Sequence, residues 1–164
     1  MPVIAAQTCD REVVTEYSST TSRAVIQHDL TADSNIYASL SEGFKAGGYA
    51  TYECTEPYDP EEVTSLEFGF KGSLGENTSL NASLFRYDYT DFQVLQVVGI
   101  QTVTRNAGDA TVNGLELEAL TNVSDSLTLN YGVTLLDATY GDFLNKNGLE
   151  PVSYTHLTLP TTCT

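Results

Sequence analysis

The chain has 164 residues and a formal net charge of −15, from 22 acidic and 7 basic residues. A chain this acidic lacks the basic surface that nucleic-acid binding requires, so we expect no nucleic-acid partner. The length suits one domain, and no apolar run reaches the roughly 18 residues of a transmembrane helix.

The N-terminal segment, residues 1–20, shows no sustained period, and the sequence leaves open whether it holds a preceding strand or a loop. Its opening lacks the basic n-region and the apolar core of a signal peptide. If the mature protein is exported, we expect its signal upstream of the printed chain.

A hairpin is predicted next, because apolar and polar residues alternate in Arg23–Leu30 and again in Asn35–Ser41, with turn residues at 31–34 between them. From Glu42 to Glu62 the alternation is lost and Gly and Pro become frequent, which predicts a long loop.

Two further strands, Val63–Ser73 and Ser79–Tyr89, flank a tight turn at Gly75–Thr78. In the second strand the apolar residues up to Leu84 lie on one side, whereas the aromatic residues from Phe85 onward lie on the other. A β-bulge near Leu84 or a change of environment along the strand would explain this, and both interpretations remain open.

A second long excursion is predicted between Thr90 and Ala110, and inside it Thr102–Asn106 can pair back onto Phe92–Val98. Two long strands follow, Thr111–Thr121 and Ser126–Leu135, and the last alternates without interruption.

The alternating strands predict a membrane β-barrel, whose apolar side faces lipid and whose polar side faces a watery lumen. Strands of about ten residues suit a tilted crossing of the bilayer, and long and short connections alternate as they do in outer-membrane barrels. The predicted lumen-facing residues are Glu67, Lys71, Glu116 and Glu118. The predicted lipid-facing residues are Leu66, Phe68, Phe70, Leu115, Leu117, Leu127, Leu129, Tyr131, Val133 and Leu135.

Five ordered segments carry a resemblance to a known family: NIYASLSEGFKAGGY, PEEVTSLEFGFKGSL, SLNASLFRYDYTDFQVLQ, TRNAGDATVNGLELEAL and LTLNYGVTLLDATYGDF. Together they resemble the C-terminal half of the barrel of a TonB-dependent outer-membrane receptor, over residues 21–143. The resemblance implies an all-β, antiparallel up-and-down meander that forms part of a barrel of about 22 strands. Within this family, the chain most resembles the receptors for ferric siderophores.

The resemblance also implies a function and partners. A receptor of this kind imports a scarce large solute, such as a ferric siderophore, across the bacterial outer membrane, with energy relayed by the TonB complex through an N-terminal region that this chain does not contain. Its other partner is outer-membrane lipid. Two alternatives are a different outer-membrane barrel, a porin or an adhesin, and a soluble acidic β-sandwich that binds carbohydrate or protein.

The start of the first long loop carries Phe44, Lys45 and Tyr49 beside several glycines. These side chains could contact a ligand or the plug domain of such a receptor, or they could fold the strand end against the plug or the barrel wall. Near the strand ends, Tyr87, Tyr89, Phe92 and Tyr140 fit an aromatic girdle that anchors the barrel at the membrane interface.

Neither catalytic residues nor a cofactor or metal site is predicted, and we do not expect an enzyme. No nucleophile, base and orienting group can be assembled from the motifs present, and Cys9, Cys54 and Cys163 lack the spacing of metal ligands. Whether Cys9 pairs with Cys54 stays open. Residues 144–150 are expected to begin an external loop, and residues 151–164 are expected to be a non-native tail without lasting strand pairing.

Overall fold

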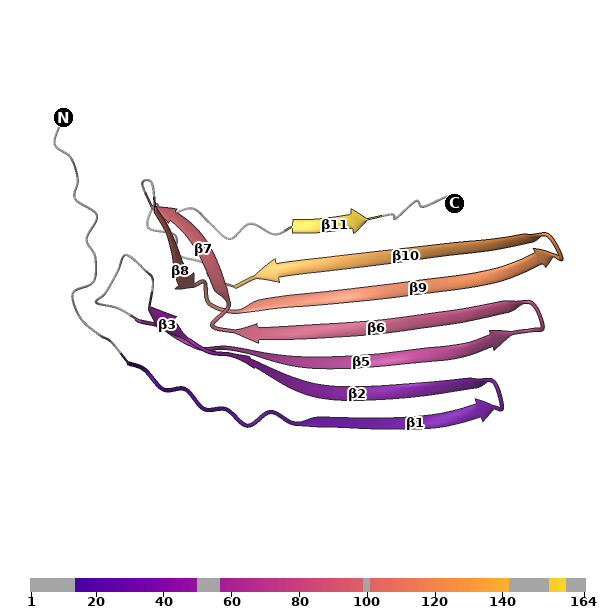
Figure 1. Ribbon diagram of the computed structural model, residues 1–164, viewed down its shortest axis with the longest axis horizontal. Helices are drawn as coiled ribbons and strands as arrows, with labels where there is room; N and C mark the ends of the chain where they lie inside the picture. The colour runs from indigo at the N-terminus through magenta and orange to yellow at the C-terminus, as the bar shows by residue number, and fades with distance from the viewer. Residues whose placement is uncertain (1–13, 50–56, 99–100, 142–153, 159–164) are drawn as a thin grey trace, which may run out of the picture.

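The computed structural model describes residues 14–49, 57–98, 101–141 and 154–158, and this part of the chain is all β. Seven strands form one antiparallel sheet in the order β1-β2-β5-β6-β9-β10-β11 (Figure 1). Its strands are β1 (Arg23–Thr31), β2 (Ser34–Lys45), β5 (Glu61–Leu74), β6 (Thr78–Thr90), β9 (Ala110–Ser124), β10 (Leu127–Tyr140) and β11 (Tyr154–Thr158). The predicted up-and-down meander is therefore confirmed.

Two small hairpins branch from one end of the sheet. The first pairs β3 (Gly48–Tyr49) with β4 (Pro57–Tyr58), and the second pairs β7 (Gln93–Val98) with β8 (Gln101–Asn106), as the sequence predicted for the second excursion. Figure 1 shows both hairpins at the end opposite the three tight turns. We call these two ends the loop end and the turn end. Residues 50–56 and 99–100, within the two long connections predicted from the sequence, lie outside the described residues.

The pairing register decides between the two interpretations of β6. Strand β6 pairs with β5 and with β9 without a shift across Leu84 and Phe85. There is therefore no bulge there, and the switch from aliphatic to aromatic side chains is a change of environment along one regular strand.

The first long loop is shorter than predicted, because β2 continues to Lys45. Phe44 pairs with Glu62 and Lys45 pairs with Glu61. The alternation fades in this stretch, yet two neighbouring strands that are already in register keep donating and accepting backbone hydrogen bonds whatever the side chains are.

The expectation that the tail makes no strand pairing is wrong. Residues Tyr154–Thr158 form β11, which pairs with β10 from Thr134 to Ala138. An edge strand presents a row of free N–H and C=O groups to any extended segment within reach. Pairing of this kind does not test whether residues 151–164 are native to the protein, so that assignment stays a prediction.

The sheet is a single layer. The buried hydrophobic residues among those described are Val103, Ala107, Ala110 and Ala119, whereas large apolar side chains on the sheet are open, with Phe68 53% exposed and Leu84 58% exposed. A β-sandwich would bury one face of this sheet against a second sheet. The described residues form no such second layer, so the soluble sandwich is excluded as their fold.

Candidate functional site

The apolar face of the sheet is a continuous band that crosses six strands. Residues that pair directly across antiparallel strands point to the same face. One row runs from Ile26 through Ala38, Phe68, Leu84 and Leu115 to Leu135. The rows beside it contain the other predicted lipid-facing residues up to Leu129. Leu127 lies beyond a register shift at the turn end.

The apolar side chains on this face are more exposed than the polar side chains on the opposite face, which is the reverse of the pattern in a soluble protein. In β5 the apolar Leu66 and Phe68 are exposed, whereas their polar neighbours Ser65 and Glu67 are half-buried. A large exposed apolar surface marks a site of contact with a membrane or another protein.

The apolar band ends at a polar rim toward the loop end. Arg86 donates from Nε and Nη2 to the two carboxylate oxygens of Asp88, each at 2.7 Å, and the Thr111 hydroxyl donates to Asp88 Oδ1 at 2.9 Å. Arg86 pairs with Leu66, so these charges lie on the same face as the band. Charged groups at this end of the band are expected where the sheet passes from an apolar layer into water.

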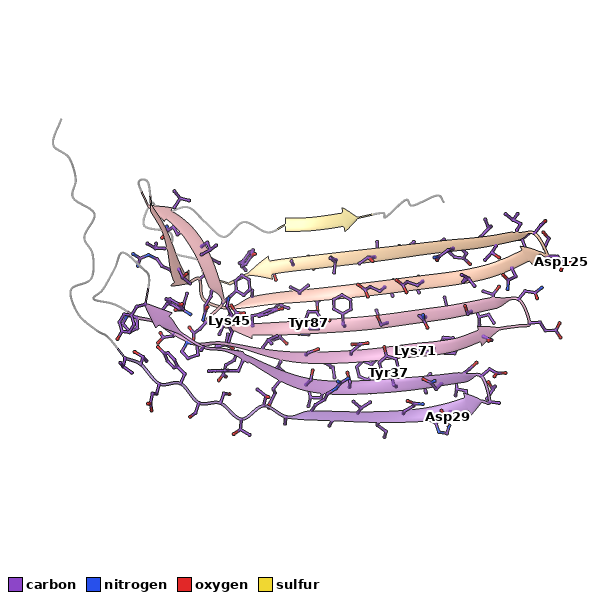
Figure 2. The ribbon with its side chains drawn as sticks, in the orientation of Figure 1. Asp29, Tyr37, Lys45, Lys71, Tyr87 and Asp125 are labelled. Carbon is purple, nitrogen blue, oxygen red and sulfur yellow. The ribbon has the colours of Figure 1, made fainter. Side chains whose placement is uncertain are left out.

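The opposite face is polar and carries all four predicted lumen-facing residues. The Tyr37 hydroxyl donates a hydrogen bond to Glu67, and Lys71 Nζ lies 5.3 Å from the centre of the Tyr37 ring. Figure 2 shows Tyr37 and Lys71 together in the middle of the sheet. With Glu116 and Glu118, these side chains line a shallow hollow of about 210 Å³.

Two aromatic rings on the polar face lie over glycines of the neighbouring strand. The Tyr37 ring covers Gly69, and the Phe85 ring covers Gly114, so that a Cβ atom at either glycine would overlap the ring. An aromatic side chain packed on a cross-strand glycine stabilises the pair where the glycine itself offers no side chain. The glycines thus fix where the rings lie.

The prediction of an aromatic girdle on the lipid side is wrong for the three tyrosines that lie in strands. Tyr87, Tyr89 and Tyr140 lie on the polar face, as the register shows, and not at the edge of the apolar band. The Tyr87 ring stacks on the Phe85 ring, with 4.9 Å between the ring centres. The centre of the Phe92 ring lies 5.3 Å from that of Tyr89 and 5.8 Å from that of Tyr140. The loop end of the polar face therefore carries an aromatic cluster.

The three residues predicted at the first loop are not brought together as one surface. Phe44 and Lys45 are neighbours in β2, so their side chains point to opposite faces. Lys45 lies on the polar face at the loop end (Figure 2), where its Nζ is 3.8 Å from Glu61 Oε2. Tyr49 is in the separate hairpin β3–β4. Ligand contact by these residues remains a prediction.

Sequence reasoning missed the residues that hold the loop end together, above all Gln93 and Asn106. Both side chains make hydrogen bonds to the backbone of the connection between β2 and β5, which we call the first excursion. The connection between β6 and β9 is the second excursion. The sequence held one signal for them, their position. Gln93 begins the first strand-like run of the second excursion and Asn106 ends the second run, so the two amides pair at the base of that hairpin.

Two searches of the described residues bear on other kinds of site. No helix in this part of the chain is long and apolar enough to cross a membrane. Nor does this part hold a group of three or more His, Cys, Asp or Glu side chains arranged for a metal ion.

A family model described as TonB dependent receptor-like, beta-barrel, matches residues 6–160. Among curated proteins, the chain is 34% identical over 91 residues to a probable TonB-dependent siderophore receptor, PiuA, of Acinetobacter baumannii. It is 33% identical over 95 residues to the pesticin receptor of Yersinia enterocolitica. Each match covers 55% of the chain but only 11% and 14% of the relatives, so the chain spans a small part of their length.

Among solved structures, the fold matches the ferric yersiniabactin uptake receptor FyuA from Yersinia pestis. The TM-score is 0.61 at 23% sequence identity, over 73% of this chain and 18% of that one. At this identity the likeness concerns the fold alone.

Proposed function

The chain belongs to the TonB-dependent receptor β-barrel family, and from this we infer that it forms part of the barrel wall of an outer-membrane active-transport receptor. The cargo proposed is a scarce large solute, a ferric siderophore, and the proposed source of energy is the TonB complex. Receptors in this family are outer-membrane proteins, so the same location is proposed here. A passive porin and an adhesin are less consistent with the family match.

The observation that carries the proposal is the division of one sheet into two unlike faces. An apolar band of exposed side chains continues across β1, β2, β5, β6, β9 and β10, and a hydrogen-bonded polar surface lies behind it. A barrel that crosses a bilayer around a polar interior needs this division. We therefore propose that Leu66, Phe68 and their row partners contact lipid, and that Glu67, Lys71, Glu116 and Glu118 face the lumen.

The cargo is proposed from the relatives. One is named a probable siderophore receptor, and the structural neighbour is titled a ferric yersiniabactin uptake receptor. Because the chain corresponds to a small part of these proteins, the plug domain and the contact with TonB are proposed to lie in the rest of the receptor. The DNA that flanks this coding region should then encode a plug domain upstream.

Transport itself is tested by uptake of radiolabelled ferric siderophores into cells that carry or lack the intact receptor. The proposal predicts saturable uptake that disappears when TonB is inactivated. Uptake of small solutes that persists without TonB would favour a passive porin. Loss of surface adhesion with unchanged iron uptake would favour an adhesin.

A further inference from the structure

The two excursions at the loop end are joined by a pair of amide side chains. Gln93 and Asn106 sit opposite each other at the base of the β7–β8 hairpin, where they pair in register. Both side chains turn away from their own hairpin toward the chain that leaves β2 and enters β5. We call Gln93, Asn106 and the groups that they bind the amide clasp.

Asn106 binds the backbone of Asp59 as a neighbouring strand would. Its Oδ1 accepts from the Asp59 N–H at 2.7 Å, and its Nδ2 donates to the Asp59 carbonyl at 2.9 Å. The same Nδ2 also donates to the Asp91 carbonyl at 2.6 Å. One side chain thus connects backbone groups of both excursions, and it reaches a residue, Asp59, that lies 47 positions away in the sequence.

Gln93 makes the second half of the clasp and is only 9% exposed. Its Nε2 donates to the carbonyls of Ala46, at 3.0 Å, and Asp59, at 3.1 Å, while its backbone N–H donates to Glu61 Oε2 at 2.7 Å. Ala46 follows the last residue of β2, and Glu61 is the first residue of β5. Gln93 therefore holds the two ends of the first excursion.

A neutral side-chain amide suits the groups that the clasp binds. The clasp faces three backbone carbonyls and one backbone N–H, so it needs both donors and an acceptor, and the amide supplies them without charge. A carboxylate would bring its oxygens against the carbonyl oxygens. An aliphatic side chain would leave these backbone groups without this partner, and the cost is greatest at the buried Gln93.

We propose that Gln93 and Asn106 are positioning residues that join the bases of the two excursions, residues 46–49 with 57–61 and residues 91–98 with 101–108, into one mechanical unit at the mouth of the barrel. A displacement of one hairpin then displaces the other. The unit also holds Phe92, which exchanges backbone hydrogen bonds with Ala107 and Gly108, and so fixes one ring of the aromatic cluster. This inference concerns coupling between loops and stands apart from the identity of the cargo.

The test is hydrogen–deuterium exchange on the intact receptor in lipid, comparing Asn106→Asp and Gln93→Glu with the unmodified protein. Both changes keep the size of the side chain and remove its donors. The matched control is Gln96→Glu on the same strand, because Gln96 takes no part in the clasp. All three variants add the same negative charge.

Asn106→Asp is expected to raise exchange about tenfold in residues 57–61 as well as in 91–108, the fold-change that corresponds to losing one well-formed hydrogen bond. Gln93→Glu should do the same, and Gln96→Glu should leave 57–61 unchanged. Faster exchange confined to 91–108 in both clasp variants would overturn the proposal.

Exchange in β9 and β10 reports whether each variant is folded. If Gln93→Glu loses protection there as well, the partly exposed Asn106 decides the outcome. Failure of the proposed transport function would leave this result unchanged, because the exchange measurement requires no cargo.

Discussion

The apolar face and the polar face of the sheet use the same strands, yet their side chains are held in different ways. On the polar face, Tyr37 bonds to Glu67 and covers Gly69, and Phe85 covers Gly114, so the wall is fixed by its own contacts. On the apolar face, Phe68 and Leu84 remain more than half exposed. The apolar face is therefore stabilised by its surroundings outside the chain, whereas the polar face is stabilised by contacts within the chain.

The largest expected effect comes from placing a charge on the apolar face. Val133→Arg should destabilise the receptor by about 2 to 4 kcal/mol near the bilayer midplane, because the guanidinium would have to leave water. Thr134→Arg is the matched control at the same depth, since Thr134 points to the polar face opposite Glu116. A refolding titration in lipid measures both. Equal penalties would contradict the assignment of the two faces.

The next effect breaks packing within the polar face. Gly114→Ala should cost about 1 to 3 kcal/mol, because its Cβ overlaps the Phe85 ring. Gly132→Ala should stay within about 1 kcal/mol of the unmodified protein, in either direction, because the nearest atom to its Cβ is a carbonyl oxygen at 3.6 Å. Urea unfolding in lipid compares the two.

A double mutant sharpens this prediction. Phe85→Leu should recover much of the loss caused by Gly114→Ala, since the two positions are coupled by direct contact. Purely additive losses would show that the ring does not rest on the glycine.

A smaller effect is expected from the hydroxyl of Tyr37. Tyr37→Phe removes the hydrogen bond to Glu67 while keeping the ring over Gly69, and it should cost about 1 kcal/mol. Tyr131→Phe is the control on the apolar face, where this tyrosine is 55% exposed. The same unfolding measurement applies. A greater loss for Tyr131 would mean that the apolar face makes polar contacts of its own.

The smallest effect is expected at the rim. Arg86 and Asp88 are about half exposed, with side-chain exposures of 53% and 48%, and water screens a pair of this kind. Arg86→Gln should leave the unfolding midpoint unchanged at moderate salt. A clear loss of stability that persists at high salt would show that the rim is less hydrated than the geometry indicates.

Sequence periodicity predicted the sheet well where one face is uniformly apolar. Strands β5, β9 and β10 follow from strict alternation, because a strand places every second side chain on the same side. The end of β2 at Lys45 could not be read in this way, since its last pairs depend on a partner strand and not on its own pattern.

Aromatic residues and long-range contacts were harder to predict. A tyrosine is amphipathic, so Tyr87 and Tyr89 suit a lipid interface and a polar lumen equally well until pairing fixes their face. The side-chain donors of the amide clasp reach backbone carbonyls of the first excursion 34 to 47 positions away, and no local sequence pattern indicates a contact over such a separation. The pairing of β11 depends on an open sheet edge, which is a property of the assembled sheet.

Nitroxide labelling along β9 tests the central claim most directly. Labels would be introduced one at a time in the intact receptor in lipid, as Leu115→Cys, Glu116→Cys, Leu117→Cys and Glu118→Cys, after the native cysteines are replaced by serine. The account predicts high oxygen accessibility at Leu115 and Leu117 and high accessibility to a water-soluble nickel chelate at Glu116 and Glu118. Labels that show no alternation, or the opposite alternation, would contradict the division into a lipid face and a lumen face.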